Sequence, residues 1–254
     1  MQCLSIRLKM VTFMHMNKCS LRSLQFFVLL CAVSAPIASW SARPLNTDDA
    51  NIVDPKSCQV ETWFKKNHDS TEYWAVPGCN FGYDIEWSVG GQKQWNQSDP
   101  NGQVGLIQAK KRWKPLEPGS WGASTTVGLL RSRWGDGTSD QHLDRYLNVP
   151  ISHAFENGSV VHLNLGLVNH TDLGTLRRTH GLGAEQPVSS SSYLIAETFG
   201  EKEQPSRYQV GFRVWLIPQR VQLDTTYGNN VYRTDSQTRW FSIGLRLLSP
   251  AFLP

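Results

Sequence analysis

Long apolar runs are the first feature that this sequence lacks. A membrane-spanning helix needs about 20 consecutive apolar residues, and no run after residue 42 approaches that length. Apolar stripes with the 3.6-residue period of an amphipathic helix are also scarce beyond this point. Mean hydropathy is −0.36, a value that strands with alternating apolar and polar residues would also produce. These absences favour an all-β fold.

The sequence also lacks a large excess of charge of one sign. No acidic residue precedes Asp48, whereas Arg7, Lys9, Lys18 and Arg22 lie near the start of the chain. Without those four cations the formal net charge of +4 falls to zero. No Lys/Arg cluster with interleaved aromatic residues is present, so we expect no nucleic-acid partner.

The one clear apolar run is short, Leu24–Ala38, and it follows the basic stretch, as in a secretory signal peptide. We therefore predict that residues 1–42 are a signal peptide, cleaved after Ser41 or Ala42. Met16 is an alternative start that would give the leader a more ordinary length. The competing interpretation is an N-terminal anchor that is retained.

Period-2 alternation bounded by turn residues recurs along the rest of the chain. In Arg207–Ile217, Val210 and Phe212 lie on an apolar face. Gln209 and Arg213 lie on the opposite, polar face. The strands expected on this basis are Cys58–Lys66, Thr71–Cys79, Asp84–Gly90, Val104–Trp113, Trp121–Leu129, Arg145–Phe155, Val160–His170, Thr179–Gln186, Ser192–Gly200, Arg207–Ile217, Val221–Asn229 and Trp240–Leu248.

The composition of the polar face indicates which kind of β protein this is. It carries glycine and serine with isolated charges, which suits the interior of a membrane barrel, whereas a soluble sandwich exposes many Lys, Glu and Thr residues. An even number of strands, mostly about 9–11 residues long, is typical of bacterial outer-membrane barrels. The ten tryptophans fit the aromatic belts of a membrane protein. We predict an antiparallel transmembrane β-barrel over residues 58–254; the alternative is a soluble β-sandwich or calyx.

The connections between the expected strands alternate in length. The odd-numbered ones, such as Gly91–Gly102 and Arg131–Asp144, are generally longer and more polar than the even-numbered ones. Because outer-membrane barrels have short periplasmic turns and longer extracellular loops, this alternation places both termini in the periplasm.

Cysteine is scarce beyond the leader, where only Cys58 and Cys79 remain. Two cysteines in an exported protein indicate one disulfide. Cys58 opens the first expected strand and Cys79 closes the second, so antiparallel pairing places them side by side. We predict a Cys58–Cys79 disulfide at the periplasmic rim.

Several short motifs resemble a known family. They are Arg43–Ala50 (RPLNTDDA), Leu116–Gly122 (LEPGSWG), His180–Glu185 (HGLGAE), Ala196–Glu201 (AETFGE) and the terminal Phe241–Leu248 (FSIGLRLL). Together they resemble a proteobacterial family of outer-membrane barrels described as transporters, close to the phenol-degradation outer-membrane group. The resemblance implies that the protein admits small, often hydrophobic molecules.

Catalytic and metal-binding motifs are not evident. Ser152 and His153 are neighbours in a strand and point to opposite faces, so they cannot act as nucleophile and base. His162 and Asn164 share a face, but no serine is obviously placed near them. Two cysteines and scattered histidines give no metal-ligand spacing. We therefore expect no enzyme activity, no cofactor and no metal site.

The best candidates for functional residues are isolated charges on the polar faces. These lumen-lining candidates are Glu61, Glu86, Lys110, Arg213, Asp224 and Arg246. They would either set the selectivity of a channel or pair with one another to fill the interior. The polar segment 43–57 lacks a strand pattern and is expected to fold into the periplasmic mouth as a partial plug.

Three functions follow from this barrel. The first is a channel or uptake pore for small molecules in the outer membrane of a Gram-negative bacterium. The second is a non-conducting structural or surface-interaction barrel, and the third is a lipid hydrolase at the barrel rim. The expected partners are outer-membrane lipid and lipopolysaccharide, the barrel-assembly machinery and an unidentified small-molecule solute.

Overall fold

The computed structural model describes residues 45–135, 140–232 and 236–254. The predicted signal peptide lies outside these residues. No helix in the described part of the chain is long and apolar enough to cross a membrane.

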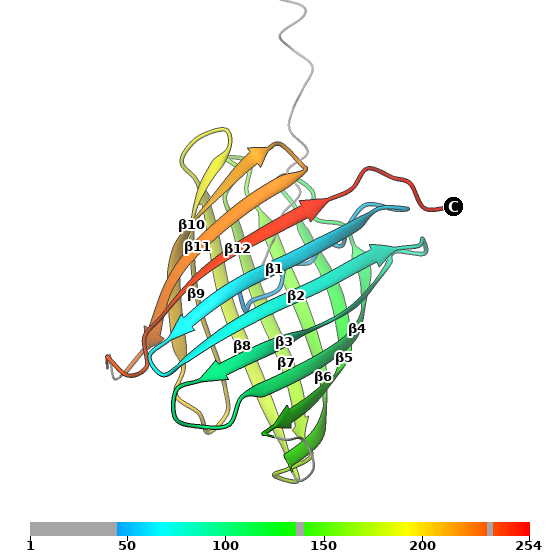
Figure 1. The fold of residues 1–254 in the computed structure, drawn as a ribbon. Coiled ribbons are helices and arrows are strands. Elements are labelled where there is room, and N and C mark those ends of the chain that lie inside the picture. Colours follow the sequence, from blue (N-terminus) through cyan, green and yellow to red (C-terminus); the bar gives the residue numbers. More distant parts are fainter. Residues whose placement is uncertain (1–44, 136–139, 233–235) are drawn as a thin grey trace, which may run out of the picture. The chain divides into compact units, whose positions relative to one another are not determined.

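Twelve antiparallel strands form one closed barrel, in which β1 pairs with both β2 and β12 (Figure 1). The predicted twelve-stranded antiparallel barrel is therefore confirmed. The strands are β1 (Cys58–Asn67), β2 (Ser70–Asn80), β3 (Ile85–Asn96), β4 (Gly102–Lys114), β5 (Trp121–Trp134), β6 (Asp140–Ala154), β7 (Val160–His170), β8 (Thr175–Pro187), β9 (Ser192–Glu201), β10 (Arg207–Ile217), β11 (Val221–Asn230) and β12 (Trp240–Leu248).

The observed strands differ from the expected ones mainly in length. β7, β10 and β12 have the expected bounds, but β5 continues to Trp134 and β6 already begins at Asp140. Much of the polar sequence expected in the connections 91–102 and 131–144 therefore pairs as strand. Backbone hydrogen bonds extend the wall there without needing an apolar face, which is why alternation did not predict these ends.

The barrel is polar inside and apolar outside. In β10, Gln209 and Arg213 are each 1% exposed, whereas Val210 and Phe212 are 49% and 41% exposed. The same inversion recurs in β11 and β12, where Asp224 and Ser242 are buried. Outward apolar side chains on other strands include Phe64, Trp87, Val89, Ile107, Val127, Leu147, Leu163, Leu165, Leu182, Leu194, Phe241 and Ile243. A soluble protein places its apolar side chains the other way round.

Cys58 and Cys79 lie directly opposite each other on β1 and β2 and form the predicted disulfide, with a Cα–Cα distance of 4.0 Å. We call this end of the barrel the disulfide end and the other the open end. The C-terminal tail also lies at the disulfide end, where the Ser249 amide donates to the Cys58 carbonyl and the Phe252 amide to the Lys56 carbonyl.

Candidate functional site in the barrel interior

Leu45–Ser57, which we call the N-terminal segment, lies inside the ring of strands (Figure 1). It contains no helix or strand. Even so, Thr47, Asp49 and Ala50 are almost completely buried. The segment must therefore satisfy its backbone polar groups with side chains of the barrel wall.

Glu197 on β9 holds the start of the segment. Its carboxylate accepts hydrogen bonds from the backbone amides of Asn46 (2.8 Å) and Thr47 (2.7 Å). The Gln209 side chain on β10 donates to the same carboxylate at 2.7 Å. Because charge-assisted hydrogen bonds of this kind are strong and directional, the buried Glu197 carboxylate fixes the position of this stretch of chain.

Asn164 on β7 and Ser152 on β6 hold the middle of the segment. Asn164 accepts from the Asp48 amide at 2.9 Å and donates to the Asp48 carbonyl at 2.6 Å. The Ser152 hydroxyl accepts from the Ala50 amide at 3.0 Å. Amide and hydroxyl side chains thus replace the strand pairing that the segment lacks.

Glu86 and Asn80 hold the end of the segment near the disulfide. Glu86 accepts from the Val53 amide at 2.8 Å, and the Asn80 side chain donates to the Val53 carbonyl at 2.8 Å. Lys110 on β4 adds an ionic contact, because its ammonium lies 2.8 Å from Asp48 and 3.1 Å from Asp49. Both acids belong to the segment, so this lysine binds the segment to the wall through charge.

The structure places the six lumen-lining candidates in two interior groups. Glu86 and Lys110 contact the segment, as described, and Arg246 donates to Gln59 at 2.7 Å and lies 3.8 Å from Glu61. These four charges and part of the segment surround a small polar cavity of about 30 Å³.

Arg213 and Asp224 form the second group. The Arg213 guanidinium donates to Asp224 at 2.5 Å and to Glu185 at 2.6 Å, and all three side chains are almost fully buried. Buried charges need close partners of opposite sign to offset the loss of hydration. Arg213 is therefore paired with acids on two other strands of the barrel, Asp224 on β11 and Glu185 on β8.

The expectation that no serine lies near His162 is wrong. Ser152 is opposite His162 in the β6–β7 register, and its hydroxyl lies 2.8 Å from His162 Nδ1. His162 Nε2 in turn lies 3.3 Å from Glu185. Cross-strand register creates the trio, and single-strand alternation cannot show it. Since the Ser152 hydroxyl is buried against the Ala50 amide, it does not face a substrate at the rim.

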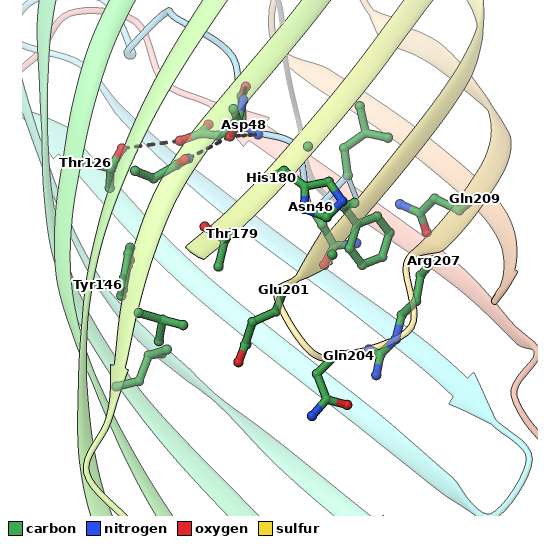
Figure 2. A pocket seen from close by; sticks show the side chains of 18 of the residues that line it. Asn46, Asp48, Thr126, Tyr146, Thr179, His180, Glu201, Gln204, Arg207 and Gln209 are labelled. Atoms are coloured by element: carbon green, nitrogen blue, oxygen red, sulfur yellow. Dashed lines mark hydrogen bonds between the residues drawn. The ribbon is translucent and has the colours of Figure 1, made fainter. Parts of the chain in front are cut away.

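Between the segment and the open end lies a cavity of about 550 Å³, which we call the vestibule (Figure 2). Asn46 and Asp48 of the segment contribute to its lining, as do Glu201 and Arg207 near the open end. Its aromatic lining residues are Trp63, Trp74, Tyr146, Phe199 and Trp240. Trp63 and Trp74 stack with ring centroids 5.2 Å apart. The segment thus forms part of the wall of the vestibule.

Sequence analysis did not single out Glu197, and it noted Asn164 only as sharing a face with His162. Both lie on inward faces of strands that were predicted correctly or nearly so. Their contacts with the segment could not be foreseen, because residues more than 100 positions apart meet there. Glu185, which binds Arg213 and His162, was likewise not singled out.

Solved structures with the same fold are outer-membrane proteins. An outer-membrane channel named COG4313 from Pseudomonas putida F1 aligns with a TM-score of 0.59 at 9% identity, covering 80% of this chain and 98% of that one. The KdgM porin aligns with a TM-score of 0.55 at 10% identity, covering 74% and 98%. The same porin has been solved in complex with disordered oligogalacturonate. These likenesses show the fold.

No curated protein matches the sequence. The sequence does match a protein family over residues 29–248, which is well over half of the chain. The match begins within the predicted leader and ends at the last residue of β12. The chain therefore belongs to the family described as "Uncharacterised conserved protein UCP029691".

Proposed function

We propose that this protein is an outer-membrane channel for small molecules whose pore is closed by its own N-terminal segment. One observation carries the proposal. The vestibule of about 550 Å³ ends at a segment that side chains hold in place, without any strand pairing. Such contacts can be exchanged for water while the barrel ladder stays intact.

The membrane position follows from the inverted barrel. Its outward apolar side chains match the hydrocarbon interior of a membrane. Because the ring of strands is closed, no strand has an edge whose backbone groups lack hydrogen-bond partners in lipid. The two solved structures described above are named as an outer-membrane channel and a porin, which agrees with this proposal. We place the disulfide end in the periplasm and the open end outside the cell.

We propose small, uncharged and partly apolar solutes. The vestibule combines tryptophan, leucine and phenylalanine side chains with charges of both signs. These charges are paired in part: Lys65 lies 3.5 Å from Glu72, and His170 lies 3.0 Å from Glu201. A wall without an excess of one charge gives little selectivity for ions of one sign.

The second candidate is a barrel that never conducts. The close fit of the segment favours it, because Glu197, Asn164, Ser152 and Glu86 each bind a backbone amide of the segment. In that case the segment would be a permanent part of the interior and the vestibule a surface pocket.

Single-channel conductance in planar bilayers separates the two candidates. We expect the full mature chain to be mostly closed and a variant lacking Arg43–Asp54 to conduct steadily. A matched control is Lys56→Ala, which changes a residue beyond the deleted stretch and keeps the backbone carbonyl that accepts from the tail. If the deletion variant folds but remains closed, the channel proposal is wrong and the second candidate stands.

A further inference from the structure

We propose that the open end carries a binding site for a divalent transition-metal ion of the zinc class, formed by His142, Asp144 and Asp172 with His170 as an additional ligand. This inference is independent of whether the barrel conducts. His142 and Asp144 lie two residues apart on β6, His170 ends β7, and Asp172 lies in the following turn. No metal spacing exists along the sequence, so only the fold brings these groups together.

The ligand atoms are close enough for one ion. One ligand atom each from His142, Asp144 and Asp172 lie within 4.8 Å of one another. His142 Nε2 and Asp144 Oδ2 are 3.9 Å apart. Zinc binds imidazole nitrogen and carboxylate oxygen at about 2.0–2.2 Å, so ligand atoms around one tetrahedral ion lie roughly 3.4 Å apart. Side-chain rotations at His142 and the exposed Asp172 that shorten the longest separation, at most 4.8 Å, to this spacing would complete the geometry.

The surroundings of His170 add a second imidazole nitrogen beside the same Asp144 oxygen. Its Nδ1 lies 3.0 Å from Asp144 Oδ2, and its Nε2 lies 3.0 Å from Glu201 Oε1. A neutral imidazole has only one N–H to donate. If Nε2 donates to Glu201, the lone pair of Nδ1 faces a carboxylate oxygen, and a cation shared by the two would remove the repulsion. Metal-binding histidines commonly donate their other nitrogen to a carboxylate in this way.

The central carboxylate is already positioned for such a role. Asp144 is largely buried, and its Oδ1 accepts from the Thr171 amide at 3.0 Å, which leaves Oδ2 facing the two histidines. Arg177 donates to Glu201 at 3.2 Å, on the other side of His170. The arrangement therefore offers nitrogen and oxygen ligands together with a supporting carboxylate, as zinc sites do.

The alternative is that His170 is a doubly protonated imidazolium held between Asp144 and Glu201. That arrangement satisfies both contacts without a metal ion. It predicts no specific zinc binding, so one titration distinguishes the two.

The test is calorimetric titration of ZnCl₂ into the full mature chain in detergent, after treatment with a chelator. We expect one ion per chain, with affinity falling at least about 100-fold in the double variant His142→Gln, Asp172→Asn. Both substituted residues are at least partly exposed, so folding should survive. Glu201→Gln should weaken binding about 10- to 100-fold, as loss of a supporting carboxylate does.

The matched control is His68→Gln, Asp69→Asn, which removes another contacting His–Asp pair in the β1–β2 turn. Among the described residues no third ligand group lies with this pair, so its loss should leave zinc affinity unchanged. The visible absorption of bound Co²⁺ gives a second readout of tetrahedral ligands. Equal zinc binding by the wild type and by the His142/Asp172 variant, or binding lost only in the His68/Asp69 control, would overturn the proposal.

Discussion

At the scale of single residues, the position of the N-terminal segment depends on a glycine in the barrel wall. A Cβ atom added at Gly181 on β8 would lie 2.7 Å from the Thr47 hydroxyl, too close for an undisturbed contact. The neighbouring inward position on the same strand, Gly183, would place its Cβ 3.4 Å from Thr47, an ordinary contact. The two glycines therefore allow a matched comparison.

We predict that Gly181→Ala loosens the segment, whereas Gly183→Ala does not. Overpacking typically costs about 1–3 kcal/mol, and here the cost falls on a segment without strand pairing. The measurement is the rate at which an added protease cleaves within residues 45–57 of the folded barrel. Equal rates in the two variants would show that Thr47 adjusts freely.

A second residue-scale prediction concerns the buried guanidinium of Arg213. Replacing it with Met leaves Glu185 and Asp224 buried without this partner, which should cost about 3–5 kcal/mol. Urea unfolding followed by tryptophan fluorescence measures the loss. Adding Glu185→Gln and Asp224→Asn should restore much of the stability; a triple variant as unstable as the single one would contradict this electrostatic explanation.

At the scale of elements, the strands were largely predictable and their contacts were not. Alternation predicted β7, β10 and β12 with their observed bounds, because in each strand the outward side chains are mostly apolar and the inward ones mostly polar. It gave too short a β5 and β6, because their outer parts pair through the backbone alone. The Ser152–His162 contact was missed because it depends on the register between two strands, which neither strand's sequence reveals.

The hairpin β1–β2 and its disulfide give an element-scale prediction. The variant Cys58→Ser, Cys79→Ser should lose about 3 kcal/mol of unfolding free energy, because the loop between the cysteines is no longer closed in the unfolded chain. The urea midpoint of this variant should match that of the wild type treated with a reductant. An unchanged midpoint would mean that the pairing of β1 with β12 alone fixes this hairpin.

At the scale of the whole molecule, the ladder should form without the segment. β1 pairs with β12 over nine residue pairs, from Gln59↔Leu248 to Asn67↔Trp240, and none of them involves the segment. We predict that the variant lacking Arg43–Asp54 still shows heat-modifiable mobility in gels, with the unheated form migrating differently from the boiled form. Loss of this behaviour would mean that the segment is needed for closure.

The direction in which the N-terminal segment runs has a consequence for how the protein can be labelled. Leu45 lines the vestibule, whereas Ser57 adjoins the disulfide end, so the chain travels along the interior before it joins the wall. A fluorophore attached at Leu45 would therefore occupy part of this space of about 550 Å³, whereas one on the C-terminal tail would lie at the disulfide end.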